Sequence, residues 1–256
     1  MGEHFKKVHL NFGQKILKIE EVLKKYLITE QKWIPWQLKE NGQKNLRINK
    51  KKFVYLISPN KIKNSFYKSL ESVFKSKKVS FFQLRLKNEN SKNKLFIGKK
   101  IKKICKKYRV KFLINDDVLL AKKLGADGCH LGQNDMELIK ARILIKKKII
   151  GITCHNSIKL AKLADKDGAD YLALGAFNSS KTKKVKYRAD TNLLKRVKKV
   201  TNAPIVAIGG INYKNYKKLL LNNANFLAIS GYIWNNKKLE PFEAIKKIKW
   251  KFMLVK

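Results

Sequence analysis

Eight short apolar segments recur along this chain, and their spacing restricts the fold more than any other feature of the sequence. Each is predominantly apolar, with Val, Ile, Leu and Phe most frequent, and lacks a regular alternation of apolar and polar residues. Continuous apolar strands are typical of a parallel sheet that is buried on both faces. The segments begin at Phe53, Val79, Val110, Asp127, Ile149, Asp170, Pro204 and Asn225.

Lysine-rich stretches with helical spacing separate these segments. Leu95, Ile101 and Ile104 fit one helical face, as do Leu194 and Val197. Strand and helix therefore alternate, and eight such units predict a single (β/α)8 TIM barrel over residues 51–256. The alternative is a doubly wound open sheet, but its dinucleotide-binding glycine fingerprint is absent after the first strand.

One unit of the chain recurs three times in recognisable form. The copies are AKKLGADGCHLG from Ala121, AKLADKDGADYLALG from Ala161 and LLLNNANFLAISG from Leu219. Each predicts a helix, a turn and a strand, with Gly or Asn in the left-handed conformation that ends the helix. We expect Asp127 and Asp170, which precede strands in this repeat, to be turn or cap residues outside the functional site.

Residues 1–50 are predicted to form a separate basic extension. A helix is expected over 16–26, followed by Trp33, Pro35 and Trp36. The favoured interpretation is an extra helix that caps the bottom of the barrel or packs at a dimer contact. The alternative is an arm that binds a partner, and the sequence leaves a homo-oligomer open.

The formal net charge of +42 suggests nucleic-acid binding, but its distribution favours a solvated surface. Only six of the 60 basic residues are arginine, the side chain that most often reads base edges, and the lysines are spread along the whole chain. We therefore predict no specific nucleic-acid partner.

The sequence contains neither a bilayer-length apolar run nor a secretory signal, so we expect a cytoplasmic protein without membrane contact. Three cysteines, Cys105, Cys129 and Cys154, are predicted to be small buried hydrophobes.

Polar residues cluster where the predicted strands end, which is the catalytic face of a barrel. Asp116 and Asp135 follow neighbouring strands and could share Mg²⁺ with a substrate diphosphate. The groups expected to bind the other diphosphate oxygens are Arg85, Lys87, Ser180, Thr182 and Lys183. Gly210, Ser230 and Gly231 follow the seventh and eighth strands, the usual place for a monophosphate.

Seven motifs in this order resemble the thiamine phosphate synthase family. They are QLRLK at Gln83, IND at Ile114, GADGCHLGQND at Gly125, GITCHN at Gly151, SSKTK at Ser179, VAIGGI at Val206 and AISG at Ala228. The resemblance implies a transferase that condenses hydroxymethylpyrimidine diphosphate with thiazole phosphate, giving thiamine phosphate and diphosphate.

The resemblance also implies a role for each matching residue. Gln83 would recognise the pyrimidine, Asp116 and Asp135 would hold Mg²⁺, and Thr153 would lie near the reacting centre, where relatives carry serine. The diphosphate would contact Arg85, Lys87, Asn115, Ser180, Thr182 and Lys183, and the thiazole phosphate would contact Gly210, Ser230 and Gly231. Lys183 and Thr153 would be the catalytic pair.

Two other functions fit the same fold. A thiazole tautomerase would use His155 to move a proton, and a non-catalytic barrel would bind phosphate or nucleic acid. His130 is expected to be buried against the barrel wall, and Asp117 to cap a helix. The loop after the sixth strand lacks the family's prolines, having Ala176 and Ser179 in their places, which predicts a change in its stiffness.

Overall fold

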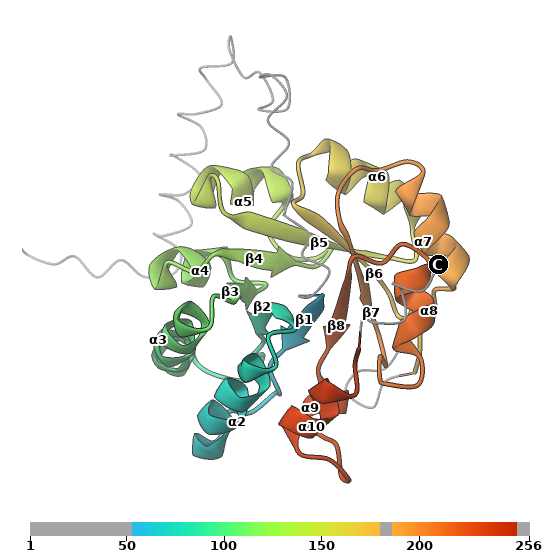
Figure 1. Ribbon diagram of the computed structural model, residues 1–256. Helices are drawn as coiled ribbons and strands as arrows, with labels where there is room; N and C mark the ends of the chain where they lie inside the picture. Colours follow the sequence, from blue (N-terminus) through green and yellow to red (C-terminus); the bar gives the residue numbers. More distant parts are fainter. Residues whose placement is uncertain (1–52, 180–185, 250–256) are drawn as a thin grey trace, which may run out of the picture. The chain divides into compact units, whose positions relative to one another are not determined.

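The computed structural model describes residues 53–179 and 186–249, and it confirms the predicted barrel. Eight parallel strands pair in sequence order, and β1 pairs with β8 to close the ring (Figure 1). The strands are β1 (Val54–Ile57), β2 (Val79–Leu84), β3 (Lys111–Asn115), β4 (Gly128–Leu131), β5 (Ile149–His155), β6 (Tyr171–Gly175), β7 (Ile205–Ile208) and β8 (Phe226–Ile229). The extension expected over residues 1–50, with its helix, lies outside the described residues.

Helices follow the strands and surround the ring. They are α2 (Asn64–Lys75), α3 (Ser91–Lys107), α4 (Val118–Leu124), α5 (Leu138–Ile145), α6 (Ile158–Lys166), α7 (Thr191–Lys198), α8 (Tyr216–Leu221), α9 (Gly231–Trp234) and α10 (Pro241–Lys246). Within 53–179 and 186–249, no helix has the length and apolar content that a membrane crossing requires.

Apolar side chains fill two layers. The larger layer lies between strands and helices and includes Cys105, Cys129 and Cys154, which are buried as predicted. The smaller layer fills the barrel interior and includes Tyr55, Phe81, Leu113, Tyr171, Val206 and Phe226. This interior is a packed core, so the open ends of the strands are where a ligand can bind.

The internal repeat ends its helices as predicted. Gly125 (φ 58°), Gly168 (φ 87°) and Asn223 (φ 76°) all take positive φ angles just after α4, α6 and α8. Glycine and asparagine adopt this conformation at least cost, which explains their recurrence at one place in each copy.

Asp127 and Asp170 lie in the turns before β4 and β6, as predicted, and their side chains also accept hydrogen bonds from the preceding strand. The side chain just before each of β4, β6 and β8 accepts a hydrogen bond from a backbone N–H at the start of the preceding strand. The pairs are Asp127 with Phe112 (2.9 Å), Asp170 with Ile150 (2.8 Å) and Asn225 with Ile205 (2.8 Å). We call Asp127, Asp170 and Asn225 the strand clamps; all three lie at the N-terminal ends of the strands.

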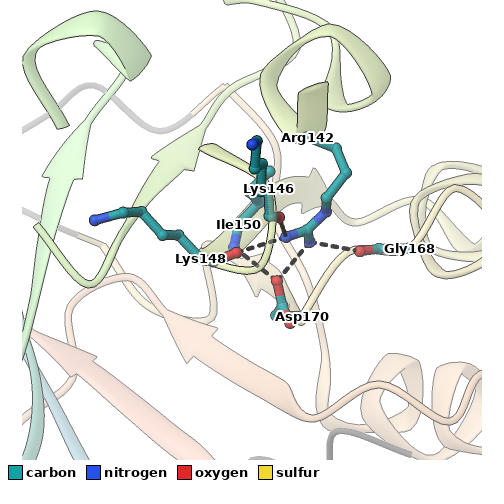
Figure 2. A network of polar contacts seen from close by, with 6 residues as sticks. All are labelled: Arg142, Lys146, Lys148, Ile150, Gly168 and Asp170. Atoms are coloured by element: carbon teal, nitrogen blue, oxygen red, sulfur yellow. Dashed lines mark hydrogen bonds and ion pairs between the residues drawn. The ribbon is translucent and has the colours of Figure 1, made fainter. Parts of the chain in front are cut away.

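The Asp170 clamp is reinforced by a buried arginine (Figure 2). Arg142 Nη2 lies 2.6 Å from Asp170 Oδ2, and their side chains are only 17% and 11% exposed. The guanidinium also donates to backbone carbonyls of Lys146, Lys148 and Gly168. A single arginine therefore joins the end of α5 and the starts of β5 and β6.

Candidate active site

Strands β2 and β3 bring two amides together at the mouth of the barrel. Gln83 is buried, and its Nε2 donates to Asn115 Oδ1 over 2.5 Å. Both residues were predicted to bind substrate, and the structure brings them into contact. With Nε2 occupied in this way, Gln83 keeps its Oε1 acceptor for a ligand.

Strand β2 ends at Leu84, just before Arg85. The backbone N–H of Arg85 donates to Ser58 Oγ (2.9 Å), and Arg85 Nη1 donates to Asn60 Oδ1 (3.2 Å). The side chain of Ser58 therefore replaces a strand partner and turns the chain outward. Sequence reasoning did not identify Ser58 or Asn60, which carry no motif of their own.

The two carboxylates predicted to bind a metal are neighbours. Asp116 has φ 63°, and its N–H donates to the carbonyl of His130 over 2.8 Å, which ties it to the loop that carries Asp135. Asp135 Oδ2 accepts from the N–H of Gly132 (2.6 Å), and Lys87 Nζ lies 3.5 Å from Asp116 Oδ2.

The pKa of the Asp135 carboxyl is raised above its ordinary value. Burial is the largest cause, and the hydrogen bond and negative charge of Asp116 also raise this pKa. The hydrogen bond from the Gly132 N–H and the positive charge of Lys87 lower it. Two carboxylates that repel each other at a mouth lined with cations form a donor set suited to Mg²⁺, which binds one or two carboxylates and takes its other ligands from water and phosphate. The described residues contain no group of three or more His, Cys, Asp or Glu side chains that could hold a metal ion by itself.

Asp117 caps α4 as predicted, because its Oδ1 accepts from the N–H of Leu120 (2.8 Å). Its side chain points toward the first turn of α4, so the carboxylate pair predicted to bind the metal consists of Asp116 and Asp135.

Thr153 lies near the end of β5, where its side chain contacts His130. His130 Nε2 is 2.8 Å from Thr153 Oγ1, and Gln133 Nε2 donates to the carbonyl of Thr153 over 2.5 Å. His130 is buried, as expected from the sequence, and its ring stacks on that of Tyr171 in the barrel interior.

The glycines after β7 hold the loop that follows β6. Gly209 (φ 108°) and Gly210 (φ 55°) take left-handed conformations, and a Cβ on Gly210 would overlap the carbonyl oxygen of Ser179. The N–H groups of Phe177 and Asn178 donate to the carbonyls of Ile208 and Gly209. Gly210, which is predicted to bind the thiazole phosphate, therefore lies against the start of the loop after β6, which is predicted to bind the diphosphate.

Ser180, Thr182 and Lys183 lie outside the described residues. On either side of them, the backbone of Ala176 pairs with Tyr187 and Ala189 over 3.0 Å. Backbone hydrogen bonds thus fix the described flanks of this loop, where the family resemblance would place prolines.

His155 also contacts the far flank of this loop. Its ring centroid lies 4.3 Å from that of Tyr187, and Asn156 Nδ2 donates to the carbonyl of Arg188 (3.0 Å). Tyr187 was not identified from the sequence.

Ser230 connects the last strand to the first. Its Oγ donates to the carbonyl of Ser58 (3.2 Å), and Ser230 and Gly231 form the start of α9. Trp234 Nε1 donates to the carbonyl of Ile57 (2.7 Å), which fixes α9 at the mouth of the barrel.

Comparisons with known proteins agree on one family. The family model described as thiamine monophosphate synthase matches residues 54–233. The chain is 72% identical to a thiamine-phosphate synthase of Pelagibacter ubique over 207 residues, covering 80% of this chain and all of that protein. It is 37% identical to a thiamine-phosphate synthase of Erythrobacter litoralis, covering 75% of this chain and 92% of the relative.

A solved structure of a thiamine phosphate pyrophosphorylase from Pyrococcus furiosus superposes with a TM-score of 0.69 at 27% identity. The superposition covers 78% of this chain and 94% of that chain.

Proposed function

Because the chain belongs to the thiamine monophosphate synthase family, we infer that it is a transferase that joins hydroxymethylpyrimidine diphosphate to a thiazole phosphate. The products are thiamine phosphate and diphosphate. Within the structure, the adjoining carboxylates Asp116 and Asp135 with Lys87 beside them support this function best, since a diphosphate substrate needs both a metal and cations.

In this reaction the bond between the pyrimidine methylene and the diphosphate oxygen breaks, and its electron pair leaves with the diphosphate. The lone pair of the thiazole nitrogen then forms the new carbon–nitrogen bond. No proton has to move, so the protein acts by positioning the substrates and by stabilising the departing charge.

We assign the residues accordingly. Gln83 Oε1 accepts from the amino group of the pyrimidine, and Asn115 holds the Gln83 amide in place. Asp116 and Asp135 would hold Mg²⁺, which would neutralise charge on the diphosphate. The anion-binding groups on the diphosphate are Arg85, Lys87, Ser180, Thr182 and Lys183, and those on the thiazole phosphate are Gly210, Ser230 and Gly231.

The proposal is tested by assaying thiamine phosphate as fluorescent thiochrome with Asp116→Asn and the matched variant Asp117→Asn. Asparagine suits the left-handed backbone of Asp116 and also caps helices well, so both variants keep their local structure. We expect Asp116→Asn to lose roughly 10²-fold in kcat/KM for the diphosphate substrate and Asp117→Asn to stay within 2-fold. Full activity of Asp116→Asn, or of the native protein in EDTA, would contradict the metal assignment.

A further inference from the structure

A chain of four polar side chains crosses the interior of the barrel. Tyr55 Oη lies 2.8 Å from Tyr171 Oη, which lies 2.9 Å from His130 Nδ1. On the other side of the imidazole, His130 Nε2 lies 2.8 Å from Thr153 Oγ1. This series of hydrogen bonds therefore runs from the apolar core to the mouth. It ends on the Thr153 hydroxyl, which the family resemblance would place near the reacting centre.

The geometry of this chain is fixed by packing. The ring of Tyr171 is completely buried and stacks on His130, with centroids 5.6 Å apart and an interplanar angle of 10°. Gly151 makes room for it, because a Cβ at that position would overlap the hydroxyl end of the Tyr171 ring. Phe81 and Tyr55 contact the same ring from β2 and β1.

The hydrogen bonds favour a neutral imidazole, because an imidazolium would donate from Nδ1 to Tyr171 and leave the Tyr55 hydroxyl without an acceptor. Burial lowers the pKa of His130 to about 4, although the charge of Asp135 raises it slightly. In a neutral imidazole one ring nitrogen donates a hydrogen bond and the other accepts. Only two arrangements of protons along the chain are then consistent.

In the first arrangement, Tyr55 donates to Tyr171, Tyr171 donates to Nδ1, and the protonated Nε2 donates to Thr153. The reverse arrangement makes Thr153 donate to Nε2 and leaves the Tyr55 hydroxyl proton to find another acceptor. Among residues 53–179 and 186–249, Tyr171 Oη is the only polar partner of Tyr55 Oη. A buried hydroxyl donor without an acceptor is costly, which favours the first arrangement.

We propose that Tyr171 and His130 are positioning residues that hold the Thr153 hydroxyl as a hydrogen-bond donor toward the bound pyrimidine diphosphate. Nε2–H occupies a lone pair of Thr153 Oγ1, so the proton of that hydroxyl is directed away from His130. Its acceptor is a lone-pair atom of the substrate, a ring nitrogen or a diphosphate oxygen. The identity of the acceptor rests on the synthase function inferred above. The positions of the protons on Tyr171 and His130 do not depend on that function.

The arrangement is measured directly by nitrogen NMR on the full chain labelled at its histidines, of which there are four. Chemical shifts distinguish a protonated from an unprotonated ring nitrogen, and the spectrum of His130→Gln identifies the His130 signals. We expect protonated Nε2 and unprotonated Nδ1 at neutral pH, and loss of this preference in Tyr171→Phe. A protonated Nδ1 in the native protein overturns the proposal whether or not the protein has synthase activity.

Kinetic measurements test whether the hydrogen bonds from Tyr171 through His130 act through Thr153. Tyr171→Phe removes only the hydroxyl, and we expect kcat and kcat/KM for the pyrimidine diphosphate to fall together, on the order of 10-fold, with KM unchanged. The matched control is Tyr216→Phe, which removes a buried, hydrogen-bonded hydroxyl from α8 outside the barrel interior and should leave kcat unchanged.

In a Thr153→Val background, Tyr171→Phe should have no further effect on kcat, because the two changes interrupt one path. An equal loss in both backgrounds would mean that Tyr171 acts by another route and would overturn the proposal. The diphosphate-free pyrimidine alcohol, used as a competitive inhibitor, identifies the acceptor. A change in its inhibition constant in Tyr171→Phe identifies the ring, and an unchanged constant identifies the diphosphate.

Discussion

At the scale of single residues, the contact between Asp116 and Asp135 has a cost in stability. The folded carboxyl of Asp135 has a raised pKa, so it takes up a proton at a pH where the unfolded chain is still ionised. Stability therefore falls as the pH rises through that raised pKa. A bound divalent cation removes the repulsion that causes it.

We accordingly expect Asp135→Asn to raise the midpoint of thermal unfolding in EDTA at pH 7, by about 1–2 °C. The amide oxygen can still accept from the N–H of Gly132, so only the charge is lost. With Mg²⁺ and inorganic diphosphate added, the ranking should reverse, because ligand at ten times its Kd stabilises the native protein by about 1.4 kcal/mol. An unchanged ranking, measured by differential scanning calorimetry, would count against a shared metal.

His155 separates the synthase from a tautomerase of the same fold. Its ring lies against Tyr187, which is a packing contact at the flank of the diphosphate loop. We expect His155→Asn, which suits the left-handed backbone (φ 50°), to lose less than 5-fold in synthase kcat. Lys183→Ala should lose roughly 10²-fold in both kcat and kcat/KM, because its proposed contact strengthens as diphosphate leaves.

Both variants are assayed for thiamine phosphate formation and for isomerisation of the thiazole. A severe defect in His155→Asn beside a silent Lys183→Ala would reverse the assignment.

At the scale of elements, the three strand clamps make the same backbone contact with different charges. Asp170 pairs with a buried arginine, whereas Asn225 is neutral. Replacing either with alanine leaves a backbone N–H unpaired, but only Asp170→Ala also leaves a buried guanidinium without its counter-charge.

We therefore expect Asp170→Ala to lower the free energy of unfolding by about 3–5 kcal/mol and Asn225→Ala by about 1 kcal/mol. Urea titration followed by circular dichroism measures both. Because the clamps lie at the N-terminal strand ends, kcat per folded molecule should remain within 2-fold in each variant. Equal destabilisation would show that the ion pair contributes nothing beyond the hydrogen bond.

The barrel was predictable from the sequence because each strand is apolar on both faces and each repeat carries its own helix-ending glycine or asparagine. The carboxylate pair was also predictable, since neighbouring parallel strands end at the same edge. The hydrogen bonds of Asp127 and Asp170 to the preceding strands were not, because such a contact depends on register, which no local pattern encodes.

Tyr171 and His130 were missed for a related reason. Each looks like an ordinary member of an apolar strand, and only closure of the ring brings β1, β4, β5 and β6 side chains together. The small residue at Gly151, opposite a large aromatic residue, is the one signal that could have indicated a crowded interior.

At the scale of the whole molecule, the net charge of +42 is carried by a lysine surface around a neutral core. Pairs of lysines recur along the outer helices, as in α3. Such a surface attracts any polyanion by releasing its counterions, without reading sequence.

We expect binding to random duplex DNA to be measurable at about 50 mM salt and to fall by roughly 10³-fold or more at 200 mM. Fluorescence anisotropy with two unrelated duplexes of equal length tests both the salt dependence and the absence of preference. Tight binding that survives salt and favours one duplex would support a nucleic-acid partner.

The separation of the clamps from the mouth bears on how such an enzyme can change over generations. Cohesion of the ring depends on buried contacts at one rim, while substrate contacts depend on loops at the other. Substitutions in those loops, such as Ala176 and Ser179 where the family resemblance would place prolines, leave the clamped rim intact. A lineage can therefore explore new substrate preferences at the mouth without first acquiring compensating mutations, and a designer could do the same by strengthening Asn225 to an ion pair before diversifying the loops.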